Sequence, residues 1–105
     1  MSSTYSGLPA ERCIDGDIRR HHSVTTCHTG GERSPWLAID YGTTVTVKRV
    51  DIFNRYDCCG DRTKNVEVRI SNELPTSASQ MFSGGSLLGQ FDGPGADGQH
   101  IIITG

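Results

Sequence analysis

The chain has 105 residues, 34% of them hydrophobic, and a formal net charge of −2 at pH 7. This length predicts a single domain with a thin core, because a short chain buries a modest fraction of its surface. The balanced charge argues against a nucleic-acid-binding stripe or a basic membrane-binding face, and no apolar run approaches the roughly 20 residues of a membrane span.

The first third of the chain, residues 1–34, is polar, rich in turns and without a sustained helical period. One short helical turn is expected at residues 8–12. Residues 36–40 are then predicted to form a short strand that ends at Tyr41-Gly42.

Residues 44–54 are the richest strand region of the sequence. The apolar side chains before residue 48 fall out of phase with those after residue 49. A change of phase within a strand indicates a bulge or a tight bend, so we expect one at this point.

Two more strands are predicted further along. Residues 65–71 alternate cleanly, with apolar side chains at every second position, and residues 100–104 form a last apolar strand. Residues 83–98 are predicted to be a glycine-rich loop around Leu87-Leu88. Short strands, frequent turns and almost no helix predict an all-β fold, an antiparallel β-sandwich.

Four cysteines in a short, loop-rich chain favour disulfides and an oxidising compartment, although four reduced thiols fit the same count. The adjacent Cys58 and Cys59 can pair only with strained geometry. Such a bridge would be a small, rigid apolar knob that can pack against the apolar face of a sugar. The alternative is two free thiols, or separate partners elsewhere in the chain.

The segment 54–62 carries the most informative polar residues, since it follows a predicted strand and therefore lies on a loop at a sheet edge. Asp57 can hold a guanidinium by paired hydrogen bonds, which would leave Arg55 and Arg62 with donors that point outward. Fixed donors of this kind suit a ligand made of hydroxyl and ether oxygens. A surface ion-pair network explains the same residues equally well.

This pattern resembles the F-type lectin (fucolectin) family. His28 is followed by twenty-six residues, then Arg55-Tyr56-Asp57, then four residues and Arg62, and every spacing agrees with the family motif. The run from Asp57 to Gly60, with its two cysteines, is similar to that of animal members. The resemblance covers nearly the whole chain and implies a discoidin-like jelly roll.

The resemblance also implies the residues of a fucose site. The side chains that would bind the oxygens of L-fucose are His28, Arg55 and Arg62. Asp57 would orient the arginines, and a disulfide between Cys58 and Cys59 would touch the apolar side of the sugar. His22 would lie near the methyl group of fucose, although two exposed loop histidines, His21 and His22, are the simpler explanation.

A structural calcium ion is a further implication of the resemblance, and hard oxygen ligands suit it. The matching positions are the backbone carbonyls of Arg12 and Asp17, the side chain of Asp15, and Thr25 or Thr26. A plain Asp-Gly turn explains Asp15 as well.

In the family, a C-terminal Cys-Glu strand completes this calcium site, and its cysteine pairs with the one near Cys27. We therefore expect residues 1–105 to be one F-type lectin domain that lacks terminal strands at both ends. The polar start after Met1, which is no signal peptide, agrees with a fragment of a longer chain. Cys27 is then expected either to pair with Cys13 or to stay free.

The function expected from this resemblance is a secreted, calcium-supported lectin for terminal L-fucose on glycans, and not an enzyme. One monosaccharide site should be weak, so avidity would require oligomers or tandem domains. We expect no nucleic-acid partner and no membrane insertion.

Three other functions fit parts of the sequence. The first is a discoidin-like module that binds protein or lipid. The second is zinc binding by a set whose spacing matches no compact zinc pattern, namely Cys13, His21, His22, Cys27 and His28. The third is thiol redox chemistry at Cys58-Cys59, which lacks the usual Cys-x-x-Cys spacing.

Overall fold

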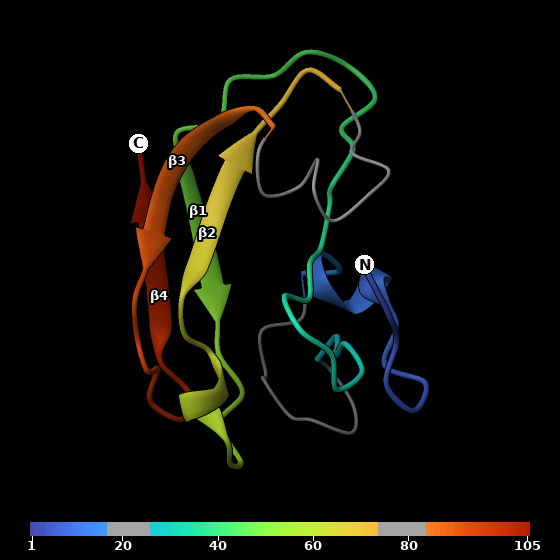
Figure 1. Ribbon diagram of the computed structural model, residues 1–105, viewed down its shortest axis with the longest axis vertical. Helices are drawn as coiled ribbons and strands as arrows, with labels where there is room; N and C mark the ends of the chain where they lie inside the picture. Colours follow the sequence, from blue (N-terminus) through green and yellow to red (C-terminus); the bar gives the residue numbers. More distant parts are fainter. Residues whose placement is uncertain (17–25, 74–83) are drawn as a thin grey trace.

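The computed structural model describes residues 1–16, 26–73 and 84–105. Its strands form two antiparallel pairs, β1 with β4 and β2 with β3 (Figure 1). In chain order they are β1 (Arg49–Phe53), β2 (Val66–Ile70), β3 (Ser86–Phe91) and β4 (His100–Thr104). The helical elements described are two short 3-10 helices, η1 (Ala10–Cys13) and η2 (Gly60–Arg62).

The two strand pairs pack against each other through β3 and β4, which gives a small antiparallel sandwich. The predicted all-β fold is therefore confirmed. At the contact between layers, a Cβ on Gly89 of β3 would lie 2.7 Å from Ile103 Cγ2 of β4, so glycine at this position leaves room for the Ile103 side chain. Ile101 and Ile103 are 3% and 4% exposed and form the centre of the sandwich.

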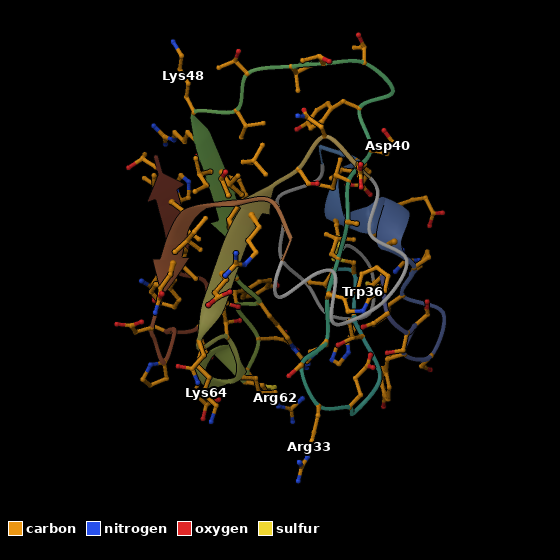
Figure 2. All side chains as sticks on the ribbon, turned by 45° about the horizontal axis from the view of Figure 1, so that its top comes forward. Arg33, Trp36, Asp40, Lys48, Arg62 and Lys64 are labelled. Atoms are coloured by element: carbon orange, nitrogen blue, oxygen red, sulfur yellow. A yellow bond between two sulfur atoms is a disulfide. The ribbon has the colours of Figure 1, made fainter. Side chains whose placement is uncertain are left out.

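The direction of the strands places two loops at the same end of the sandwich. β1 and β3 both run toward this end, and β2 and β4 start from it (Figure 1). The connections between them, residues 54–65 and 92–99, therefore meet there. Lys48, just before β1, lies at the opposite end from Lys64, just before β2 (Figure 2).

Residues 1–16 and 26–41 lie beside the strands rather than within the sheets (Figure 1). The helical turn expected at residues 8–12 is present as η1, which begins after Pro9, and Leu8 ahead of it is 4% exposed. The disulfide between Cys13 and Cys27 joins this turn to the segment that carries His28, with 5.1 Å between the two Cα atoms. Cys27 is thus paired and not free.

Backbone bonds also hold the N-terminus to this segment. The Tyr5 amide donates to the His28 carbonyl at 2.8 Å, and the His28 amide donates to the Leu8 carbonyl at 3.1 Å. Side-chain bonds to the first serines extend the contact, since the Gly30 amide donates to Ser3 Oγ at 2.7 Å and the Trp36 amide to Ser2 Oγ at 3.0 Å.

The strand predicted at residues 36–40 is wrong: the segment is not in a sheet. Its apolar side chains are only partly covered, with Leu37 and Ile39 37% and 44% exposed, and they line a shallow depression with Ile14. Alternating apolar residues make a strand only where a neighbouring strand supplies a hydrogen-bond ladder. Residues 44–48 likewise stay outside the sheet, so the predicted region 44–54 is reduced to β1.

The predicted bulge was placed on the wrong strand. β1 and β4 pair in continuous register from Arg49 to Phe53, so residues 48–49 mark the start of β1 and not an irregularity within it. The register shift lies between Val68 and Arg69, which pair with Gly89 and Leu87 of β3 and leave Leu88 as the extra residue.

The loop predicted at residues 83–98 contains β3, so that prediction was wrong for Ser86–Phe91. The bulge at Leu88 and the glycine beside it break the alternation by which a strand is recognised. The strands predicted at residues 65–71 and 100–104 are confirmed as β2 and β4. Among the described residues no helix is long and apolar enough to cross a membrane.

Candidate functional site

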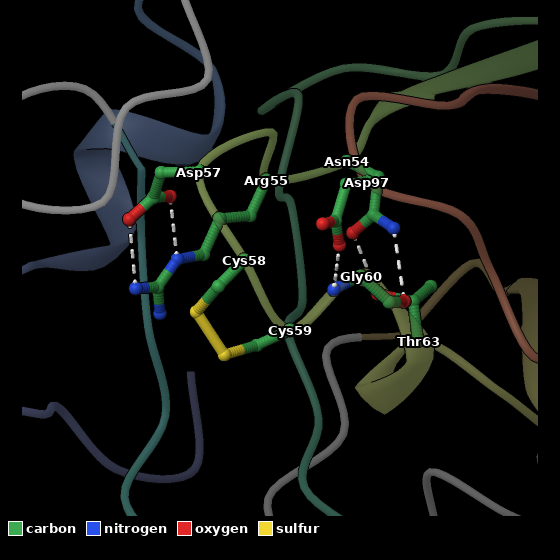
Figure 3. Close-up of polar contacts among 8 residues, drawn as sticks. All are labelled: Asn54, Arg55, Asp57, Cys58, Cys59, Gly60, Thr63 and Asp97. Carbon is green, nitrogen blue, oxygen red and sulfur yellow. Dashed lines mark hydrogen bonds and ion pairs between the residues drawn. A yellow bond between two sulfur atoms is a disulfide. The ribbon is translucent and has the colours of Figure 1, made fainter.

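Asn54 anchors the loop that follows β1. It is 6% exposed, and its side-chain amide donates to the carbonyl of Gly60 at 3.0 Å (Figure 3). The same amide donates to the carbonyl of Ala96, also at 3.0 Å. Its Oδ1 accepts a hydrogen bond from Thr63 Oγ1 at 2.8 Å. One buried side chain thus ties both ends of the 54–65 loop to the neighbouring 92–99 loop.

Further bonds join the same two loops. Asp97 Oδ1 accepts from the Gly60 amide at 2.7 Å, and the Gly98 amide donates to the Arg55 carbonyl at 2.7 Å. A Cβ on Gly60 would lie 2.6 Å from the backbone of Ala96, so glycine is required where the loops cross. The two loops therefore form one rigid platform at the end of the sandwich.

Arg55 and Asp57 form a two-pronged ion pair on this platform. Arg55 Nε donates to Asp57 Oδ1 at 2.7 Å, and Nη2 donates to Oδ2 at 2.9 Å (Figure 3). This is the paired bond predicted from the sequence. The hydrogen bond to Asp57 is the main reason why the pKa of Arg55 is raised. Because one edge of the guanidinium is held by Asp57, its plane is fixed and its other N–H groups have a defined direction.

The Cys58–Cys59 disulfide lies directly beside this ion pair (Figure 3). The two Cα atoms are 3.7 Å apart, and both residues are half-buried. Cys59 has a positive φ of 64° and caps the N-terminus of η2. The alternative of two free thiols is therefore wrong, and the loop carries a rigid sulfur-containing corner next to the Arg55 guanidinium.

Arg62 ends η2 and is exposed to solvent. Within the described ranges its guanidinium has no hydrogen bond or ion pair. Only Gly60 and Asp61 separate it in sequence from the Cys58–Cys59 corner. Its side chain extends from the same end of the molecule as Lys64 (Figure 2).

His28 is positioned from the other side, by the N-terminal segment. Its Nδ1 lies 2.5 Å from the carbonyl oxygen of Thr29. A carbonyl oxygen can only accept, so Nδ1 donates, and in the neutral ring Nε2 carries the lone pair. The ring also packs on Tyr5, with 4.8 Å between centroids.

Beyond Asp57, the charge of Asp97 also raises the pKa of Arg55. Tyr5, which packs on His28, was not predicted from the sequence. Its only signal was an aromatic residue in a polar N-terminal stretch.

The calcium ligands expected from the sequence are described only in part. Asp17 and Thr25, and also His22 of the fucose site, lie outside the described residues. The Cys13–Cys27 disulfide brings the chain at Arg12 next to the chain at Thr26, and Asp15 follows on an exposed turn. These groups offer hard oxygen atoms, as calcium requires.

The alternative of a zinc site has less support than the calcium site. Cys13 and Cys27 are bonded to each other, so they are not thiolate ligands. In the described parts of the chain no group of three or more His, Cys, Asp or Glu side chains is arranged to hold a metal ion.

Residues 12–90 match the protein family described as NedA-like, galactose-binding domain. The chain belongs to this family. The matched range of this galactose-binding-type domain contains His28, Arg55 and Arg62, together with the Cys58–Cys59 disulfide.

Its curated relatives confirm the resemblance to F-type lectins. The chain is 36% identical to fucolectin of Anguilla anguilla over 70 residues, which is 65% of this chain and 44% of the relative. It is 40% identical to fucolectin-4 of Anguilla japonica over 67 residues, which is 62% of this chain and 36% of the relative.

A third relative is larger. The chain is 38% identical to the pentraxin fusion protein of Xenopus laevis over 73 residues, which is 67% of this chain and 18% of that protein. In all three comparisons the match spans less than half of the relative's length. No solved structure matches the chain.

Proposed function

We propose that the domain is a lectin that binds terminal L-fucose on glycans at residues 54–65 of the platform. The observation that carries this proposal is the Arg55–Asp57 ion pair fixed beside the Cys58–Cys59 disulfide. It puts oriented hydrogen-bond donors next to an apolar corner. The fucolectin relatives support a sugar as the ligand.

The chemistry of the site suits a deoxy sugar. Arg55 and Arg62 can donate to hydroxyl and ring oxygens but cannot accept, whereas His28 in its neutral form adds Nε2 as an acceptor, because its Nδ1 donates to the Thr29 carbonyl. Fucose combines a set of hydroxyl groups with an apolar face and a methyl group. The disulfide would contact that apolar face, and His22 would lie near the methyl group.

The affinity for a single fucose should be weak. Hydrogen bonds to charged groups contribute roughly 1.5–3 kcal/mol each, and the costs of association remove much of the sum. We therefore expect a dissociation constant on the order of micromolar to millimolar. Glycan binding with useful avidity would then require several domains, in an oligomer or in a longer chain.

The expected roles outside the sugar site complete the proposal. A calcium ion would be held by the backbone carbonyls of Arg12 and Asp17, the Asp15 carboxylate and Thr25 or Thr26, and it would stabilise the loop that leads to His28. The two disulfides agree with a secreted protein. We propose no enzymatic activity, and the names of the fucolectin relatives support this.

The test of the fucose site is calorimetric titration of L-fucose against the wild type and Arg62→Ala. Loss of one charged hydrogen-bond donor should weaken binding about tenfold or more. Lys48→Ala, which removes an exposed cation at the opposite end of the sandwich, is the matched control and should bind as the wild type does. A wild type that binds no fucose refutes the function, and equal affinity of Arg62→Ala refutes the role of Arg62.

A further inference from the structure

Residues 1–5 form an N-terminal strap across the segment that carries His28. The Ser2 amide donates to the Trp36 carbonyl at 2.8 Å, and the Tyr5 amide donates to the His28 carbonyl, also at 2.8 Å. Ser3 lies between these two bonds, so its place beside the segment is fixed. The two bonds hold the backbone of His28 but not its ring, which is the part that would meet a ligand.

The His28 ring is oriented by the peptide group that follows it. Its Nδ1 lies 2.5 Å from the Thr29 carbonyl oxygen, and the Gly30 amide donates to Ser3 Oγ at 2.7 Å. The Thr29 carbonyl and the Gly30 N–H belong to one peptide unit, which is planar. A bond that fixes the N–H therefore fixes the direction of the carbonyl. Ser3 thus determines where the acceptor for the His28 ring lies.

Glu32 in turn orients the Ser3 hydroxyl. Ser3 Oγ donates to Glu32 Oε1, and Ser2 Oγ donates to the same oxygen at 2.6 Å. The hydrogen bonds from Ser2 and then Ser3 lower the pKa of Glu32, which keeps the group ionised near neutral pH. An ionised carboxylate only accepts, so the single proton of the Ser3 hydroxyl points to Glu32 and its lone pairs are left for the Gly30 N–H.

Ser2 and Ser3 share Glu32 but differ in their second partner. Ser2 Oγ accepts from the Trp36 amide at 3.0 Å, whereas Ser3 Oγ accepts from the Gly30 amide. Both hydroxyls therefore fasten the strap, and of the two only Ser3 bonds to the peptide group that orients the His28 ring. This difference separates a role in holding the chain from a role in holding the ring.

We propose that Ser3 and Glu32 are positioning residues for fucose binding, because they hold the Thr29–Gly30 peptide that orients the His28 ring. This rests on the proposed function, in which His28 is a fucose ligand. With Nδ1 donating to Thr29, the neutral ring presents Nε2 as an acceptor for a sugar hydroxyl. Without the Ser3 bond the peptide is free to rotate, so the ring has to be ordered when the sugar binds, and this cost lowers the affinity.

The experiment is calorimetric titration of L-fucose into the wild type and a set of variants. Ser3→Ala and Glu32→Ala should each bind about three- to tenfold more weakly. Glu32→Gln keeps a side-chain oxygen that accepts from Ser3, so its affinity should stay within about twofold of the wild type. Ser2→Ala should weaken binding less than Ser3→Ala does. Glu73→Ala, which removes an exposed carboxylate after β2, is the control and should bind as the wild type does.

Two further measurements distinguish positioning of the ring from a general loss of structure. In a His28→Ala background, Ser3→Ala should weaken fucose binding no further, because its effect passes through the ring. In the nitrogen NMR spectrum, the neutral His28 ring of the wild type should carry its proton on Nδ1. Ser3→Ala should shift the ring toward the tautomer protonated at Nε2.

Three results would refute the positioning role and leave the fucose site intact. They are equal affinity of the wild type and Ser3→Ala, an equal loss on Ser3→Ala with and without His28, and a Glu32→Gln variant as weak as Glu32→Ala. A wild type that binds no L-fucose refutes the proposed function and this inference with it.

Discussion

The two regions that supply the proposed sugar ligands are held in different ways. The strand half positions Arg55 and Arg62 through two sheets and through Asn54, whose buried amide ties two loops together. Residues 1–16 and 26–41 position His28 with a disulfide, a few backbone bonds and the hydroxyls of Ser2 and Ser3. The site therefore has one side built on a sheet ladder and one side that depends on a covalent cross-link.

Removal of the Cys13–Cys27 bridge should have the largest effect on stability. The bridge closes a loop with a sequence separation of 14 residues, and in the chain-entropy model such a loop contributes about 3 kcal/mol. The free energy of unfolding of the double variant Cys13→Ser, Cys27→Ser, measured with urea, should be lower than that of the wild type by about this amount. A loss below about 1 kcal/mol would mean that the N-terminal region is held by its hydrogen bonds after all.

Asn54→Ala tests how the strand half is held. We expect it to lower the free energy of unfolding by about 2 kcal/mol, less than the loss of the Cys13–Cys27 bridge. The substitution removes the side-chain donor to the carbonyls of Gly60 and Ala96, each of which keeps one backbone amide donor, and it leaves Thr63 Oγ1 without its acceptor. Asn72→Ala, an exposed asparagine after β2, is the control and should be neutral. If both variants unfold at the same urea concentration, Asn54 does not anchor the loops.

Reduction of Cys58–Cys59 should separate function from stability. This bridge closes almost no loop, so opening it should change the free energy of unfolding by well under 1 kcal/mol. The rigid corner beside Arg55 would be replaced by two mobile thiols, and fucose affinity should fall several-fold. Peptide mapping by mass spectrometry, paired with titration before and after mild reduction, checks this. Unchanged affinity after complete reduction would mean that the bridge does not contact the sugar.

The smallest effect on stability is expected at low pH, from the protonation of Asp51 in β1. Hydrogen bonds from Arg49 and then His100 hold the pKa of Asp51 at about 2, below its usual value. A carboxylate with a lowered folded-state pKa stabilises the fold above its unfolded pKa, and this contribution is lost as pH falls from about 4 toward 2.

Asp51→Asn should therefore unfold with a flatter dependence on pH in that window, as followed by circular dichroism. Asp40→Asn serves as the comparison, since the Asp40 carboxylate accepts a hydrogen bond from the Gly42 amide and pairs with no cation within the described residues. Parallel acid-unfolding curves for the wild type and Asp51→Asn would contradict the role of the Arg49–Asp51–His100 cluster.

The difference between the regions also explains what the sequence could predict. The Arg55–Asp57 bond was predictable because its partners are two residues apart, and β2 and β4 because their alternation is regular. β3 was missed, since its bulge at Leu88 breaks the alternation.

Contacts between residues far apart in the sequence could not be predicted, because no local pattern indicates them. The bond from Asn54 to Ala96 spans 42 residues, and the bond from Gly60 to Asp97 spans 37. Residues 36–40 have the pattern of a strand, but whether a strand forms depends on a neighbour that the pattern does not reveal. Tyr5 was missed for the same reason, because its contact with His28 depends on how the N-terminus folds back.

The most direct test of the central claim is a pair of titrations on the wild-type protein, one with L-fucose and one with D-galactose. We predict saturable binding of L-fucose in the micromolar to millimolar range, with D-galactose at least tenfold weaker, because the proposed site combines oriented arginines with an apolar corner for the deoxy sugar. Equal binding of the two sugars, or binding of neither, would contradict a fucose site at Arg55, Arg62 and the Cys58–Cys59 disulfide.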